Sequence, residues 1–73
     1  MIVYAVYEGD DFEGYRIVDN KVYHNLHDAI KGAKKRISEL NSTTSFKYKK
    51  TDDFVWESKI LGKIYVNTLD YIK

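Results

Sequence analysis

Two histidines, His24 and His27, are the side chains best suited to metal chemistry, because residues three apart on a helix can face one ion. His24, however, precedes the predicted helix cap, and Asp28 is the only nearby side chain that could supply a third ligand. The chain has no cysteine, so thiolate ligands and cysteine nucleophiles are excluded. The pattern predicts solvated or hydrogen-bonding histidines, with no metal site and no cofactor.

Acidic side chains gather in residues 8–14, EGDDFEG, where two glycines and four acids indicate the loop of a hairpin. The spacing of these carboxylates does not match a calcium loop of the EF-hand type. Phe12 lies among the acids, and an aromatic ring at an acidic loop tip is a good anchor for a protein partner. The predicted partner-contact residues are Tyr7, Glu8, Asp10, Asp11, Phe12 and Tyr15.

The sequence contains no motif for covalent catalysis or for phosphate binding. No nucleophile motif surrounds any of the serines at positions 38, 42, 45 and 58. Gly9 and Gly14 precede a predicted strand and not a helix, which excludes a Walker loop or a dinucleotide fingerprint there. The chain is therefore predicted not to be an enzyme.

Basic side chains concentrate in the middle of the chain. Residues 31–50 carry seven basic side chains and one acid, whereas residues 1–30 carry six acids and two basic side chains. Lysines that alternate with Phe46 and Tyr48 favour a second reading, in which the chain binds nucleic acid. Strand alternation, however, places rings and lysines on opposite faces, so stacking and charge would not cooperate. The residues for this alternative are Lys31, Lys34, Lys35, Lys47 and Lys49.

The length of 73 residues predicts a single domain, 1–73, with a small core to which a partner subunit could add, so a homodimer is also considered. Hydrophobic residues make up 44% of the chain and charged residues 32%, as in folded globular domains. The lack of cysteine favours a cytoplasmic setting. No apolar run of about 20 residues and no basic leader are present, so neither a membrane partner nor export is expected.

The helix has the clearest pattern of all the predicted elements. Its apolar residues recur along one stripe at helical spacing, namely Leu26, Ala29, Ile30, Ala33, Ile37 and Leu40. Asn25 is the predicted N-cap, and Asn41 is predicted to end the helix in a left-handed conformation. Gly32 is off the stripe, and it should cost about 1 kcal/mol relative to Ala unless another group approaches closely at that point.

Strands are predicted on both sides of this helix. Before it, residues 2–7 form a buried strand and residues 15–23 form a second, with a bulge or tight turn at Asp19 and Asn20. After it come strands at 46–50, 54–60 and 64–72, with turns at 51–53 and at Gly62. The fold class is α+β, an antiparallel sheet of four to five strands with one helix packed on it, in the order β-β-α-β-β-β.

One helix covers only part of such a sheet, so the other face is predicted to be open, curled or occupied by a partner. The chain has seven tyrosines, a residue that tolerates both wet and buried surfaces. Their number indicates an interface.

The opening of the chain resembles small accessory proteins encoded by bacteriophages and other mobile elements. The resemblance covers about the first 30 residues and rests on Val3, Tyr4, Val6, Glu13, Gly14, Tyr15, Ile17, Val22, Tyr23 and Ala29. It implies a stoichiometric inhibitor of a host or defence protein, of the anti-CRISPR or anti-defence type, acting in the host cytoplasm. The leading hypothesis is thus a non-catalytic protein-binding module, and a small nucleic-acid-binding or regulatory domain is the alternative.

Overall fold

The computed structural model describes residues 2–43 and 45–70, and it contains one helix and one five-stranded antiparallel sheet. The sheet order is β2-β1-β5-β4-β3, which confirms the predicted α+β fold with its two strands before the helix and three after it. The elements are β1 (Ile2–Asp10), β2 (Gly14–Tyr23), α1 (Leu26–Thr43), β3 (Lys49–Asp52), β4 (Val55–Ser58) and β5 (Gly62–Asp70).

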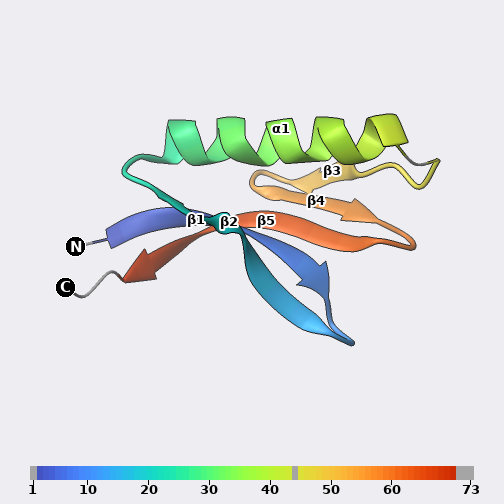
Figure 1. Ribbon diagram of the computed structural model, residues 1–73, viewed down its shortest axis with the longest axis horizontal. Helices are drawn as coiled ribbons and strands as arrows, with labels where there is room; N and C mark the ends of the chain where they lie inside the picture. Colours follow the sequence, from blue (N-terminus) through green and yellow to red (C-terminus); the bar gives the residue numbers. More distant parts are fainter. Residues whose placement is uncertain (1, 44, 71–73) are drawn as a thin grey trace.

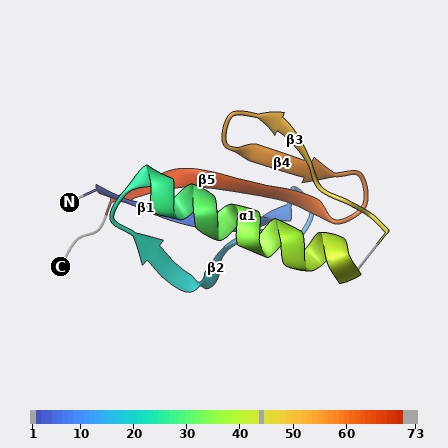
Figure 2. The same ribbon diagram turned by 90° about the horizontal axis from the view of Figure 1, so that it is seen from above.

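The helix covers one face of the sheet and leaves the other without a helix (Figure 1). Seen from above, α1 lies over the central strands β1 and β5, with β2 to one side and β3 and β4 to the other (Figure 2). The core between these layers consists of Val6, Ala29, Ala33, Ile37, Tyr48, Trp56, Ile64 and Val66. Three stripe residues are buried as predicted, whereas Leu26, Ile30 and Leu40 are half-buried and pack against this core.

Asn25 caps the start of α1 as predicted. Its Oδ1 accepts a hydrogen bond of 2.9 Å from the Asp28 backbone N–H, and its Nδ2 donates to the Asp28 carboxylate at 3.2 Å. Another group does approach Gly32 closely, since a Cβ there would overlap the Tyr23 hydroxyl. The absence of a side chain at this turn of α1 therefore lets Tyr23 of β2 pack directly against the helix.

The predicted end of the helix at Asn41 is wrong. The helix runs on to Thr43, and neither Asn41 nor any other helix residue in the described part of the chain has a positive φ. The Asn41 side chain instead accepts a hydrogen bond of 2.8 Å from the Tyr48 backbone N–H and donates one of 3.4 Å to the Tyr48 carbonyl. The Asn41 amide thus bonds to the Tyr48 backbone as a neighbouring strand would. No local sequence pattern predicts this contact between residues seven positions apart.

The predicted loop at residues 8–14 is also wrong, because β1 continues through Glu8 and Gly9 to Asp10. The turn is reduced to residues 11–13, and β2 begins at Gly14. The predicted irregularity at Asp19 and Asn20 is confirmed: their φ angles are 57° and 52°, and the β1–β2 register shifts between Ala5 and Tyr7. Beyond this bulge the hairpin bends away from α1 (Figure 1).

Two glycines let three strands approach closely around Gly9, two residues before the hairpin turn, a point that we call the root of the hairpin. A Cβ at Gly9 in β1 would overlap the Gly14 carbonyl of β2, and a Cβ at Gly62 in β5 would overlap the Gly9 carbonyl. Gly62 also has a φ of 112°, which a residue with a side chain rarely adopts. The root of the hairpin is therefore held between β5 and β2 by backbone contact.

The later strands are shifted from their predicted positions. β3 starts at Lys49 and includes Asp52, so the turn predicted at 51–53 lies at residues 53–54 instead. β4 spans only Val55–Ser58 and leaves Ile60 in the turn, 65% exposed. β5 starts two residues earlier than predicted, and Tyr71 and Ile72 lie outside the described residues. Within residues 2–43 and 45–70, no helix is long and apolar enough to cross a membrane.

Candidate interaction surface

Three tyrosines meet on the sheet face that α1 does not cover. Val6 of β1 and Ile64 of β5 point into the core, so strand alternation places Tyr7 and Tyr65 on the opposite face. The Tyr7 and Tyr65 rings stack with centroids 5.1 Å apart, and the Tyr15 ring of β2 meets Tyr65 edge-on at 5.3 Å. We call Tyr7, Tyr15 and Tyr65 the tyrosine face. All three side chains are half-buried, and burial raises the pKa of Tyr65.

Sequence reasoning found two of these rings and missed the third. Tyr7 and Tyr15 were predicted as partner contacts, and the structure brings them together around Tyr65. The alternation of Ile64, Tyr65 and Val66 indicates that Tyr65 faces away from the core. Its neighbours depend on the register of β5 with β1, which pairs Tyr65 with Tyr7 and which the sequence alone does not give.

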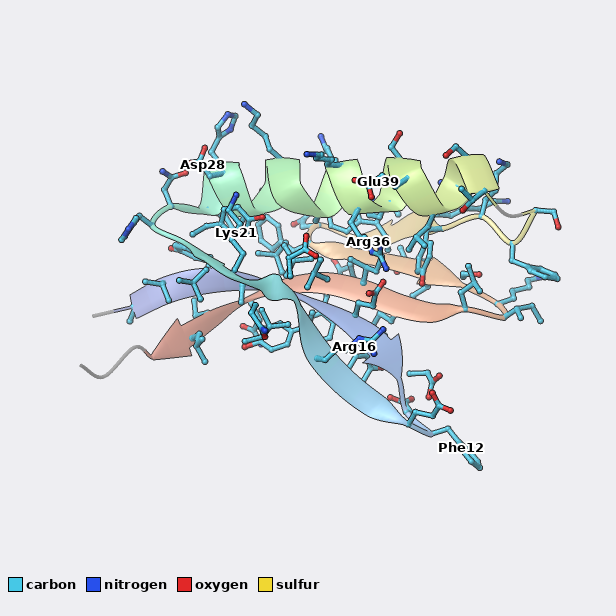
Figure 3. All side chains as sticks on the ribbon, viewed as in Figure 1. Phe12, Arg16, Lys21, Asp28, Arg36 and Glu39 are labelled. Atoms are coloured by element: carbon cyan, nitrogen blue, oxygen red, sulfur yellow. The ribbon has the colours of Figure 1, made fainter. Side chains whose placement is uncertain are left out.

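The hairpin tip, residues 10–13, carries the most exposed large apolar side chain in the described chain. Phe12 is 99% exposed and projects from the far end of the β1–β2 hairpin, away from the helix (Figure 3). The Asp10 carboxylate accepts hydrogen bonds from the backbone N–H groups of Phe12 and Glu13, at 2.8 and 2.6 Å. The backbone that presents Phe12 is thus fixed by its neighbours, although the ring itself has no cover.

A hydrogen bond joins the hairpin tip to the tyrosine face. The Tyr15 hydroxyl donates to the Asp11 carboxylate at 2.9 Å. This bond, together with the nearby negative charge, raises the pKa of Tyr15 to about 12. Tyr7, Asp10, Asp11, Phe12 and Tyr15, all predicted as partner contacts, therefore belong to one continuous region.

Glu8 is the predicted contact residue that lies apart from this region. Alternation along β1 places it on the helix side of the sheet, where it is 13% exposed. Arg36 of α1 points down toward the sheet (Figure 3) and donates from Nε and Nη2 to the two Glu8 oxygens, both at 3.1 Å. This bidentate contact raises the pKa of Arg36. Glu8 thus ties the helix to the root of the hairpin.

A cleft opens between the bent hairpin and the second half of α1. Its apolar lining comes from Leu40, Tyr48 and Leu61, and its charged lining from Glu8, Asp10, Glu13, Arg16 and Arg36. Arg36 and Glu8 neutralise each other there. Among the described residues, Glu13 makes no hydrogen bond or ion pair through its carboxylate, so this acid remains available to a partner at the edge between cleft and tip.

The lysines of the alternative hypothesis do not form one surface. Lys31, Lys34 and Lys35 are exposed on the outer side of α1. The Lys47 ammonium donates to the Asn41 carbonyl at 2.7 Å. Lys49 lies opposite Glu57 in the β3–β4 register. A separate groove between α1 and β2 has Lys21, Lys31, Lys35 and Arg36 in its lining, together with the acids Asp19 and Asp28. Only part of the predicted basic set therefore converges.

His24 and His27 are both exposed, at the entrance of α1. In residues 2–43 and 45–70, no three histidine, aspartate or glutamate side chains are grouped so that they could hold a metal ion. A metal ion therefore has no candidate site among these residues, and the absence of a metal and of a cofactor stays a prediction.

Comparison with known proteins gives this chain no family. No protein-family model matches it, and no curated protein or solved structure matches it at a significant level. The resemblance to phage accessory proteins is thus a prediction from residues alone. What the protein does has to be inferred from the surface described above.

Proposed function

We propose that this chain is a non-catalytic protein-binding module that occupies a surface of another protein with its hairpin tip and tyrosine face. The observation that carries the proposal is the exposure of Phe12, 99%, on a tip whose backbone is held by the Asp10 carboxylate. An isolated exposed apolar residue is common on protein surfaces. Phe12 differs from such a residue because it lies at the outermost point of an ordered hairpin and is continuous with three clustered tyrosines. This arrangement is a stronger indication of a binding surface.

The energetics of association favour such an arrangement. Complete burial of one phenylalanine contributes about 1.5 to 3 kcal/mol relative to its exposed state. Binding also costs entropy when loops and side chains become ordered, and this cost falls when the contact surface is already fixed. The Asp10 and Asp11 hydrogen bonds, together with the Tyr7–Tyr65 stack, order most of this surface before any partner arrives.

The most concrete form of the proposal is a phage-encoded inhibitor of a bacterial defence or host protein, of the anti-CRISPR or anti-defence type. It would act in the host cytoplasm by stoichiometric binding. The resemblance of its first 30 residues to phage accessory proteins supports this form. An inhibitor of this kind needs a stable contact surface and no reaction chemistry.

Quantitative affinity capture tests the proposal. The tagged chain, Phe12→Ala and Ile60→Ala are each incubated with bacterial lysate, and the retained proteins are measured by mass spectrometry. Ile60 is also exposed but lies in the β4–β5 turn, so its variant is the matched control. We expect a protein that wild type and Ile60→Ala retain and Phe12→Ala loses, with 1:1 binding on calorimetry. If wild type and both variants retain the same proteins, the proposal is contradicted.

A second candidate function, nucleic-acid binding, is favoured by the groove between α1 and β2. Lys21, Lys31 and Lys35 line it, and phosphate contacts by such side chains release counterions, so binding must weaken steeply as salt rises. Labelled single-stranded and duplex DNA and RNA are titrated at two salt concentrations. Micromolar, salt-sensitive binding that a Lys31, Lys34 and Lys35 charge reversal removes supports this candidate, and no binding at low salt rejects it.

A further inference from the structure

We propose that the hairpin tip inserts into an apolar pocket of the partner protein whose rim carries lysine or arginine side chains. This inference rests on the proposed function and adds the shape and charge of the partner's site. The observations behind it are Phe12, whose ring lies at the far end of the hairpin (Figure 3), and the acids next to it in sequence, Asp10, Asp11 and Glu13.

The shape of the tip requires a concave partner. Only residues 11–13 form the turn, so the tip is narrow, and the hairpin beyond the Asp19–Asn20 bulge bends away from α1 (Figure 1). A flat partner surface would touch one side of the Phe12 ring and leave the other wet. Full desolvation of a ring at the apex of a convex element requires a pocket that surrounds it.

The charge of the tip requires basic groups at the mouth of that pocket. Three carboxylates flank Phe12 within four consecutive residues, and the bonds that Asp10 and Asp11 accept come from neutral donors. Among the described residues neither acid forms an ion pair. Arg16 lines the cleft beside Asp10 and Glu13 but does not outweigh three acids, so the tip keeps a net negative charge. The Glu13 carboxylate has no hydrogen-bond or ion-pair partner within the described residues. Bringing these carboxylates against a neutral or acidic rim would remove water without replacement, which is strongly unfavourable. Lysine or arginine side chains restore the lost interactions and speed association.

Other occupants fit this tip poorly. Nucleic acids and anionic lipid surfaces repel its three carboxylates. A second copy of the chain offers the groove between α1 and β2, whose lining includes Lys21, Lys31 and Lys35. The acids Asp19 and Asp28 line the same groove, and their carboxylates would repel those of the tip. A foreign protein with a basic-rimmed apolar pocket is the partner that satisfies both shape and charge.

Site-specific photocrosslinking tests the inference with the full chain. Phe12→p-benzoylphenylalanine places the reactive ring at the apex, and the same substitutions at Tyr65 and Lys34 report on the tyrosine face and the outer side of α1. Each protein is irradiated in bacterial lysate, and crosslinked peptides are mapped by mass spectrometry. We expect position 12 to attach to an apolar pocket residue that has at least two lysines or arginines within the surrounding rim.

Charge variants sharpen the same experiment. Asp11→Asn with Glu13→Gln should lower the crosslink yield at position 12 at least fivefold, and added salt should lower it in the parent, because the rim contact is electrostatic. Glu39→Gln, which removes an exposed acid from α1, is the control and should leave the yield unchanged.

The possible outcomes separate the inference from the proposed function. A crosslink at Tyr65 but none at position 12, or a position-12 crosslink to a flat, acidic or basic-poor site, overturns the inserted tip and leaves protein binding intact. A crosslink from position 12 to the chain itself also overturns the inference and identifies a second copy as the occupant. No crosslink to any protein from any of the three positions contradicts the proposed function and the inference together.

Discussion

The helix-covered half of the molecule and the hairpin tip are both ordered, but by different means. Under α1, order comes from burial: Ile64 is fully buried, and Trp56 and Tyr48 are 7% exposed. At the tip, order comes from hydrogen bonds between Asp10 and the backbone, while Phe12 stays in water. The difference shows that the tip contributes little to folding, so its ring and charges are free to serve binding.

The helix-covered half should not tolerate a charge. Ile37→Asp forces a carboxylate against Trp56 and Ile64 without a partner, and we expect it to lower the free energy of unfolding by more than about 4 kcal/mol. A domain of this size has little more stability than that. Circular dichroism should therefore show a largely unfolded chain. Ile30→Asp, at a half-buried position of the same stripe, should be milder, and a native melting temperature for Ile37→Asp would mean the core is misplaced.

The root of the hairpin, where the two regions join, should respond to a single methyl group. Gly62→Ala combines a φ of 112° with overlap of the Gly9 carbonyl, and we expect a loss of about 2 to 3 kcal/mol. Gly14→Ala is the matched control, because its φ of 91° is also positive but a Cβ there meets nothing within 4 Å. Urea unfolding of both variants measures the difference. Equal losses would show that the close approach of β5 and β1 has no energetic weight.

The sequence pattern correctly predicted those features that depend on contacts between residues close together in the chain. The apolar stripe of α1, its Asn25 cap and the Asp19–Asn20 irregularity all depend on adjacent residues, and each was predicted correctly. The fold class followed from the order of these elements.

Contacts between distant residues account for the errors. Residues 8–14 have the composition of a loop, yet Glu8 lies in β1 and accepts a hydrogen bond from Arg36, 28 positions away. β3 consists of four exposed residues, and its strand conformation comes from pairing with β4 and from the Thr51 bond to Glu57. Tyr65 entered the candidate surface only once the register of β5 was known.

The bond between the hairpin tip and the tyrosine face can be followed through the titration of Tyr15. Its pKa is raised from 10.0 to about 12, chiefly by the hydrogen bond to Asp11. Because the folded-state pKa exceeds the unfolded one, the stabilisation is complete below pH 10 and is lost as the pH rises toward 12. NMR of ring-labelled tyrosine should show a lower Tyr15 pKa in Asp11→Asn. An unchanged value would mean that the bond is absent in solution.

Phe12→Ala should have the smallest effect on folding of all these variants and the largest effect on binding. Since Phe12 is 99% exposed, its removal should change the free energy of unfolding by less than about 0.5 kcal/mol. The same change removes the proposed anchor, and the loss should resemble that of an interface hot spot.

Surface plasmon resonance with the captured partner is the most direct test of this account. Phe12→Ala should weaken binding at least about 30-fold, mostly through faster dissociation, while its melting temperature stays that of wild type. Ile60→Ala should bind like wild type. That result would show that loss of an exposed apolar side chain elsewhere on the surface does not weaken binding. Wild-type affinity for a correctly folded Phe12→Ala would contradict the account and move the interface away from the hairpin tip.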